Sequence, residues 1–75
     1  MSITGKQSPQ RIGNNGQSGR AEITNVGDSI GWLQADADAT PKSGIPIGVG
    51  MGYIVKFRKF VSVVGINAKF KVEII

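Results

Sequence analysis

The sequence predicts an all-β fold, a small antiparallel β-sandwich or barrel of six to seven short strands with no α-helix. Its 75 residues include ten Ile and seven Val but a single Leu and five Ala. Branched side chains of this kind pack well on a pleated sheet and lose rotamer freedom in a helix. Several stretches also alternate between apolar and polar residues, which is the period of a β-strand. A chain of this length forms one domain.

The first nineteen residues are predicted to form a polar N-terminal arm, and residues 20–75 the single β domain. The arm is rich in Gly, Gln, Asn and Ser, with Ile3 and Ile12 as its apolar anchors. It carries at most one short strand, around residues 10–12. Such an arm either frays as a chain terminus or becomes ordered against a neighbouring subunit.

Residues 20–32 predict a β-hairpin. Ala21 and Ile23 alternate with polar neighbours, residues 25–28 supply turn-forming side chains, and a second strand begins after them. The stretch 34–43 is rich in Asp, Ala, Thr and Pro and suits an exposed loop. Pro46 confines the next apolar segment to a sheet edge, because proline has no N–H to donate to a ladder.

The last third of the chain predicts the three most regular strands, over residues 53–58, 60–64 and 69–74. Asn67 lies in the final turn, where asparagine tolerates the left-handed backbone. The glycines at positions 48, 50 and 52 superficially resemble a phosphate-binding loop. A dinucleotide-binding loop leads into a helix, whereas a strand follows here, so these glycines predict a bend or bulge.

The composition points away from catalysis. The chain has no Cys and no His, which removes disulfides, thiolate zinc sites and the usual general base. We therefore predict no enzyme, no cofactor, and no catalytic or metal-binding residue. Asp36 and Asp38 are spaced so that both carboxylates could face a cation, but two carboxylates are too few for a calcium site. A solvated loop is the favoured interpretation.

The net charge of +4 arises entirely from the last 25 residues, where five cations oppose only Glu73. The candidate basic interaction stripe consists of Lys56, Arg58, Lys59, Lys69 and Lys71. It is either a solvated strand face whose lysines oppose aggregation, or a surface for phosphates or an acidic protein.

Trp32, the single tryptophan, has two interpretations. A large side chain on a regular strand usually belongs to the core, and the alternative is an exposed interface aromatic. A chain of this size without disulfides or zinc also has a marginal core, and association with copies of itself or with a larger assembly is a common remedy. No targeting signal and no run of about 20 apolar residues is visible, so we expect a soluble protein without a membrane partner.

Over nearly its whole length the chain resembles a small β-sandwich domain common among virion proteins of tailed bacteriophages. The resemblance is carried by Asn14 or Asn15 followed by Arg20, by Ile23-Thr24-Asn25-Val26-Gly27 leading into Ile30-Gly31, by an Ala/Thr-rich loop, and by Gly44-Ile45-Pro46-Ile47 with Gly50 after it. The chain departs from the family in its basic C-terminal strands and in Trp32, where tyrosine or valine is more usual.

The resemblance implies a non-enzymatic building block of a phage particle, of the capsid decoration, vertex or fibre-base type. Such a protein would be assembled in the bacterial host cytoplasm and located in the virion. Its partners would be copies of itself, as a trimer or pentamer, and the major capsid protein or other virion proteins. The residues leave one alternative open, a small basic nucleic-acid-binding β-barrel. In that case the stripe would contact phosphates, and Trp32, Tyr53 or Phe57 would stack on bases.

Overall fold

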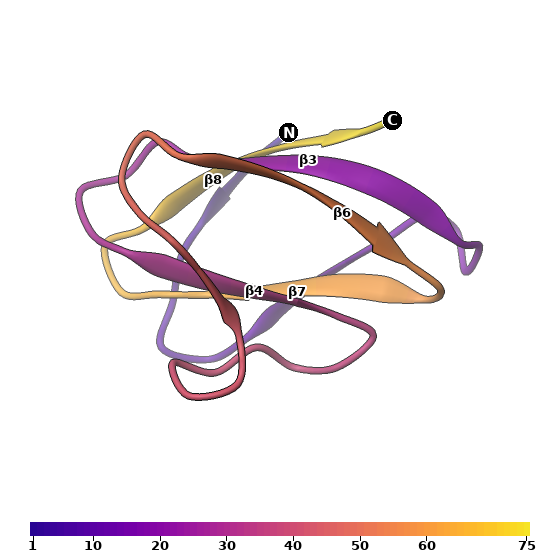
Figure 1. Ribbon diagram of the computed structural model, residues 1–75, viewed down its shortest axis with the longest axis horizontal. Coiled ribbons are helices and arrows are strands. Elements are labelled where there is room, and N and C mark those ends of the chain that lie inside the picture. The colour runs from indigo at the N-terminus through magenta and orange to yellow at the C-terminus, as the bar shows by residue number, and fades with distance from the viewer.

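Two four-stranded antiparallel sheets pack face to face in the computed structural model, which describes all 75 residues (Figure 1). The first sheet has the order β1-β8-β3-β6 and the second β2-β7-β4-β5. The strands are β1 (Ser2–Thr4), β2 (Gln10–Gly13), β3 (Gly19–Asn25), β4 (Gly31–Ala35), β5 (Ile45–Ile47), β6 (Gly52–Phe57), β7 (Phe60–Val64) and β8 (Lys69–Ile74). No helix is present, so the predicted all-β sandwich is confirmed, with eight strands in place of six or seven.

The first nineteen residues belong to both sheets, which corrects the predicted separate arm. β1 pairs with β8 at the edge of the first sheet, and β2 pairs with β7 at the edge of the second. Ile12 is buried in the core, and Ile3 packs against it. One inward apolar side chain fixes each short edge strand while its polar neighbours face solvent. The polar composition therefore concealed two strands.

The predicted hairpin over residues 20–32 is also wrong. β3 lies between β6 and β8 in the first sheet, whereas β4 lies between β7 and β5 in the second. The turn residues 26–30 therefore carry the chain from one sheet to the other. The segment 65–68 makes a second crossing, in which Asn67 has the predicted left-handed backbone (φ 64°).

The glycine-rich segment before β6 is a turn outside the strands, which fits the expected bend and not a bulge. The N–H of Met51 donates to the carbonyl of Gly48 at 3.0 Å. Gly50 has a φ of 82°, a conformation that glycine adopts without strain. Pro46 lies in β5, which pairs only with β4 and is an edge strand, in agreement with the prediction.

The core lies between the sheets and consists of inward side chains at alternate strand positions. Its largest fully buried apolar members are Phe70, Ile23, Leu33, Ile47, Val61, Val63 and Val72. β7 is buried on both faces, because the loop 36–43 covers its outer side and the N–H of Ala39 donates to Ser62 Oγ at 2.8 Å. This double burial explains why residues 60–64 show no apolar and polar alternation.

Candidate interaction surface

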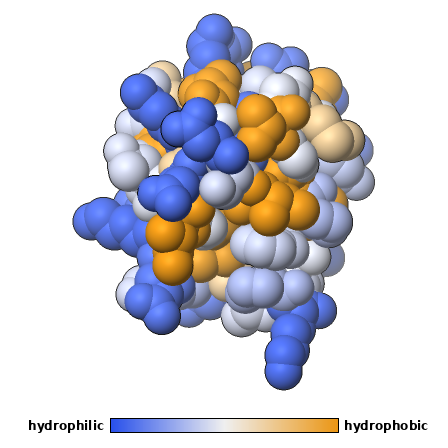
Figure 2. All heavy atoms as spheres, turned by 90° about the vertical axis from the view of Figure 1, so that its left-hand side faces the viewer, coloured by the Kyte–Doolittle hydropathy of each residue, from blue (hydrophilic) through white to orange (hydrophobic).

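One end of the sandwich gathers exposed apolar side chains, seen face-on in Figure 2. The β3–β4, β5–β6 and β7–β8 connections meet there. Gly50 N–H donates to the carbonyl of Asn25 at 2.8 Å, and Asp28 N–H donates to that of Asn67 at 2.9 Å. The exposed side chains are those of Val26, Ile30, Val49, Met51 and Ile66, each 44% to 59% exposed. We call this set the apolar end.

A buried side-chain amide fixes the loops of the apolar end. Asn25 is fully buried, and its Nδ2 donates to the carbonyls of Ser29 at 2.8 Å and Ile47 at 3.0 Å. Its Oδ1 accepts the N–H of Gly27 at 3.0 Å. The amide therefore ties the β3–β4 loop to the last residue of β5, and its hydrogen bonds offset the cost of burying it.

Two glycines let the same loop lie directly against β8. A Cβ on Gly27 would be 2.4 Å from the backbone nitrogen of Lys69, and a Cβ on Gly31 would be 2.4 Å from Cζ of Phe70. Neither distance is compatible with a side chain. The loop backbone at Gly27 is thus in contact with the backbone of β8, and Gly31, the first residue of β4, lies against the Phe70 ring. The apolar end is a packed surface held at several points.

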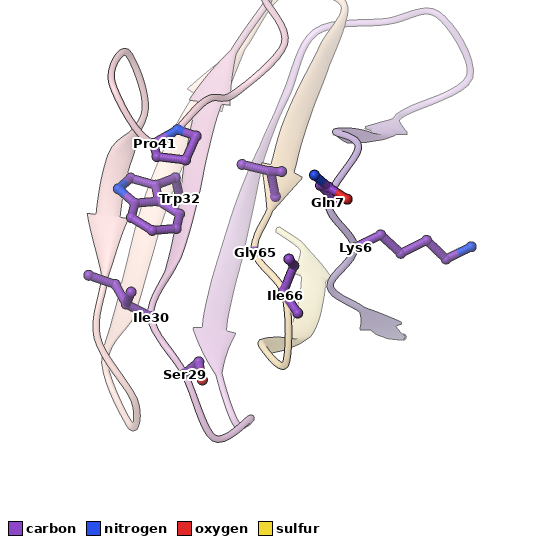
Figure 3. A pocket seen from close by; sticks show the side chains of 9 residues that line it. Lys6, Gln7, Ser29, Ile30, Trp32, Pro41, Gly65 and Ile66 are labelled. Atoms are coloured by element: carbon purple, nitrogen blue, oxygen red, sulfur yellow. The ribbon is translucent and has the colours of Figure 1, made fainter.

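Beside the apolar end lies an open groove of about 290 Å³ (Figure 3). Trp32, Ile30 and Pro41 lie on one side of it, and Ile66 lies on the other. The complete lining is Lys6, Gln7, Ser29, Ile30, Trp32, Pro41, Val64, Gly65 and Ile66. Lys6 points its ammonium group away from the groove. The groove is therefore apolar where Trp32 lies and polar at its rim.

Trp32 is half-buried on the outer face of β4, while its neighbour Leu33 fills the core. It lies opposite Val64 of β7 and Pro46 of β5. The common interpretation of a single tryptophan as a core residue is therefore wrong here. The side chain occupies a position from which it could contact a partner.

The five cations of the candidate stripe are all exposed but do not lie on one surface. Lys56, Lys69 and Lys71 belong to the outer face of the first sheet. Arg58 and Lys59 lie instead in the turn between β6 and β7, where the chain passes from one sheet to the other.

Carboxylates also interrupt the outer face. Glu22 of β3 lies opposite Glu73 of β8, in a row between the Arg20–Lys56 pair and Lys71. The position of these two carboxylates follows from the register of β3 against β6 and β8. The sequence of a single strand does not reveal this register. Lys71 Nζ lies 3.9 Å from Glu73 Oε1. The face therefore alternates in charge and is not uniformly basic.

At the opposite end of the sandwich, Asp36 caps the β6–β7 turn. Its carboxylate accepts the backbone N–H of Arg58 at 2.9 Å, of Lys59 at 2.6 Å and of Phe60 at 3.4 Å. These hydrogen bonds, the one from Arg58 first, lower the pKa of Asp36 below its ordinary value. The residue adopts a φ of 60° to reach them.

Asp38 has a different partner, so the two carboxylates do not converge on a cation. Arg11 Nε and Nη2 donate to its two oxygens at 2.9 and 3.2 Å. This bidentate pair lowers the pKa of Asp38 and raises that of Arg11. The guanidinium also lies 4.3 Å from the centroid of the Phe60 ring. The predicted solvated loop is thus tied to β2 and to the β6–β7 turn, by partners distant in sequence.

No three His, Cys, Asp or Glu side chains come together as metal ligands would. The structure contains no helix that could span a membrane. In comparisons with known proteins, no family model, curated protein or solved structure matches this chain. The geometry of the apolar end and the sequence resemblance are therefore the grounds on which a function can be proposed.

Proposed function

We propose that this protein is a non-enzymatic structural subunit of a bacteriophage virion, a small capsid-associated decoration or vertex protein that acts through homo-oligomeric assembly on the particle. The observation that carries this proposal is the apolar end. A cluster of exposed apolar side chains on a small domain marks a protein interaction site. The phage context comes from the sequence resemblance.

The apolar end suits docking because its shape is already fixed. Asn25 and the close approach of Gly27 to Lys69 hold the loops before any partner arrives. Binding to such a surface costs little ordering entropy. The groove beside Trp32 can accept one apolar anchor from the partner, and buried anchors dominate the binding energy of protein interfaces.

The nucleic-acid alternative draws less support from the surface. A backbone-tracking groove presents contiguous cations, whereas Glu22 and Glu73 divide those of the first sheet. Phe57, one of the aromatics proposed to stack on bases, is buried. Tyr53 is exposed but lies apart from the Trp32 groove lining.

The experiment uses particles of the phage that encodes the chain, stripped of this protein, and measures binding by co-sedimentation. The test variant is Val26→Ser with Ile66→Ser, and the matched control is Arg20→Ser with Lys56→Ser, a neighbouring pair on the outer face. We expect the first pair to weaken binding at least about tenfold, equivalent to roughly 1.4 kcal/mol, and the control pair to have little effect.

The salt dependence of binding distinguishes this proposal from the nucleic-acid alternative. Apolar docking should persist at about 0.5 M salt, whereas phosphate binding falls steeply with salt through counterion release. No affinity for the particle, together with salt-sensitive binding to single-stranded DNA, would overturn the virion proposal in favour of the alternative.

A further inference from the structure

The four sheet edges of the sandwich are not equally protected. β1 and β5 have three residues each, and β5 contains Pro46. β2 has four residues. β6 has six, with no proline, and it keeps an unbroken register against β3 from Gly52 to Phe57. Short strands, prolines, bulges and charged side chains, especially lysine, are devices that keep edges from pairing with other chains, and of these β6 has only Lys56.

The free hydrogen-bonding groups of β6 can be assigned from the ladder. The N–H of Asn25 donates to the carbonyl of Met51 at 2.9 Å, so this pair faces across the β3–β6 interface. Strand groups alternate in direction, which directs Tyr53, Val55 and Phe57 toward β3. Gly52, Ile54 and Lys56 therefore point to the open side.

Two further observations agree with this assignment. The carbonyl of Arg20, the residue opposite Lys56, accepts the N–H of Ile75 at 2.8 Å and so faces away from β6. No backbone hydrogen bond of the turns and loops involves Gly52, Ile54 or Lys56. The open side of β6 therefore presents three unpaired residues in a row.

We propose that β6 pairs antiparallel with β6 of a second copy of this chain, about a two-fold axis at Ile54. The two first sheets then form one continuous sheet, β1-β8-β3-β6 followed by the same strands in reverse order. This inference deepens the proposed homo-oligomeric assembly by naming its contact. It gives a dimer as the unit, unlike the trimer or pentamer expected from the resemblance.

The position of the axis follows from the geometry of the edge. A two-fold axis perpendicular to a sheet maps each face onto itself, so the pairing is centred on a residue. An axis at Ile54 pairs Ile54 with its own copy and Gly52 with Lys56 of the partner subunit. All three open residues then exchange both hydrogen bonds with a partner. An axis at Val55 would leave Gly52 opposite the turn residue Arg58.

The side chains favour the same register. Ile54, 58% exposed in the single chain, faces its own copy across the axis. Lys56 faces a glycine, so no like charges are opposed. Tyr53, 44% exposed, faces Val55 of the partner subunit in a closely spaced pair, and aromatic and β-branched residues pair favourably across strands.

An edge contact of this kind buries little area, which places it among weak interfaces. Docking of the apolar end on a particle would raise the local concentration of copies and strengthen the same contact without any new interaction. Free protein should therefore dimerise weakly and in a concentration-dependent manner.

Disulfide trapping tests the register. The chain has no cysteine, so Ile54→Cys introduces a single thiol. Facing Cα atoms in a hydrogen-bonded pair lie about 5.5 Å apart, within the range of a disulfide. The matched control is Glu22→Cys, which is exposed on the same face directly opposite Ile54. We expect covalent dimer at least about tenfold faster from Ile54→Cys. Equal rates would overturn the register.

Charge complementation tests the two-fold axis without cross-linking. Ile54→Lys and Ile54→Glu should each be monomeric, because each places like charges on the axis, and an equimolar mixture should form a heterodimer in sedimentation equilibrium. Ile54→Pro should keep the monomer fold, since the N–H it removes is unpaired, and should also lose the dimer.

Wild-type protein that remains monomeric up to about 1 mM would overturn this inference, since it would bound the dimer Kd above that range. Particle binding by Ile54→Pro reports separately on the apolar end. Failure of the dimer and failure of docking are therefore distinguishable.

Discussion

The loops at the two ends of the sandwich satisfy their polar groups in opposite ways. At the end that holds the β6–β7 turn, Asp36 accepts three backbone N–H groups, and the Arg11–Asp38 pair covers Phe60. At the apolar end, Asn25 pairs polar groups of the loops inward, and five of the loop side chains that remain outside, beside Asp28 and Asn67, are apolar.

The two ends differ in the kind of side chain that they expose to solvent. The turn end exposes charged groups that water solvates well. The apolar end exposes aliphatic surface whose burial is favourable. Hydrogen bonds within the chain therefore satisfy the turn end, whereas the apolar end keeps aliphatic surface exposed, as the proposed docking role requires.

Deletion of residues 70–75 should have the largest effect, because β8 contributes to both ends. β8 lies between β1 and β3, so its loss removes the partner of β1 and exposes one side of β3. Phe70 and Val72 are fully or almost fully buried, and each is worth roughly 1.5–3 kcal/mol. We expect an unfolded or insoluble product by circular dichroism and sedimentation. A soluble, β-rich product would contradict the assigned core.

Asn25→Ala should have the second-largest effect, and we expect it to disturb the loops of the apolar end alone. The substitution leaves two carbonyls and one N–H without their partner. Leaving buried polar groups unpaired costs about 1–3 kcal/mol, which urea denaturation would measure. The matched control is Asn14→Ala, whose amide makes one hydrogen bond at the surface. A loss no larger than that of the control would show that the amide does not hold the loops.

Asp36→Asn should weaken the turn end in a manner that depends on pH. The folded pKa of Asp36 lies below its ordinary value of 3.8. Its contribution to stability is therefore complete above that value and is lost as the pH falls through the lower folded pKa. We expect the variant to be less stable than the wild type near neutral pH and the two to converge in acid.

Chemical denaturation at several pH values would measure this convergence. Asp28→Asn is the matched control, because the Asp28 carboxylate is exposed and accepts no hydrogen bond. A stability difference that stays constant down to about pH 2, a range in which paired carboxylates become protonated, would contradict the capping role.

Lys56→Gln should have the smallest effect and sharpens the comparison by testing the outer face of the first sheet, away from the apolar end. Its ammonium group makes no ion pair, and surface substitutions away from specific contacts stay within about 0.5 kcal/mol. Thermal unfolding and particle binding should both match the wild type. A large loss of binding would instead point to the outer face as the docking surface.

The fold class could be predicted from sequence because composition and alternation act locally. The ten Ile and seven Val, the edge position of Pro46 and the left-handed Asn67 were all read from single segments. Which strands pair could not be predicted in the same way. β3 followed by a turn and β4 has the pattern of a hairpin, but each strand pairs with strands distant in sequence, and the inward hydrogen bonds of Asn25 hold the turn as a crossing between sheets.

The distribution of the candidate basic stripe over two regions could not be predicted for the same reason. Lys56 and Lys71 alternate with apolar residues on their own strands, which predicts a basic face. The register of β3 then places Glu22 and Glu73 between them. Asp36 carried no local sign of its role, because the N–H groups it accepts come from residues 22 to 24 positions away.

The strand order also determines how the molecule must fold. Of the paired strands, only β4 and β5 are neighbours along the chain, while β1 pairs with β8 and β2 with β7. Contacts between distant segments require closing long loops before they stabilise anything, and such topologies fold in milliseconds to seconds. Neither partner of β3 precedes residue 52, so β3 waits unpaired until most of the chain is available. During that interval β3 is an open strand, and β6 keeps one open side after folding is complete.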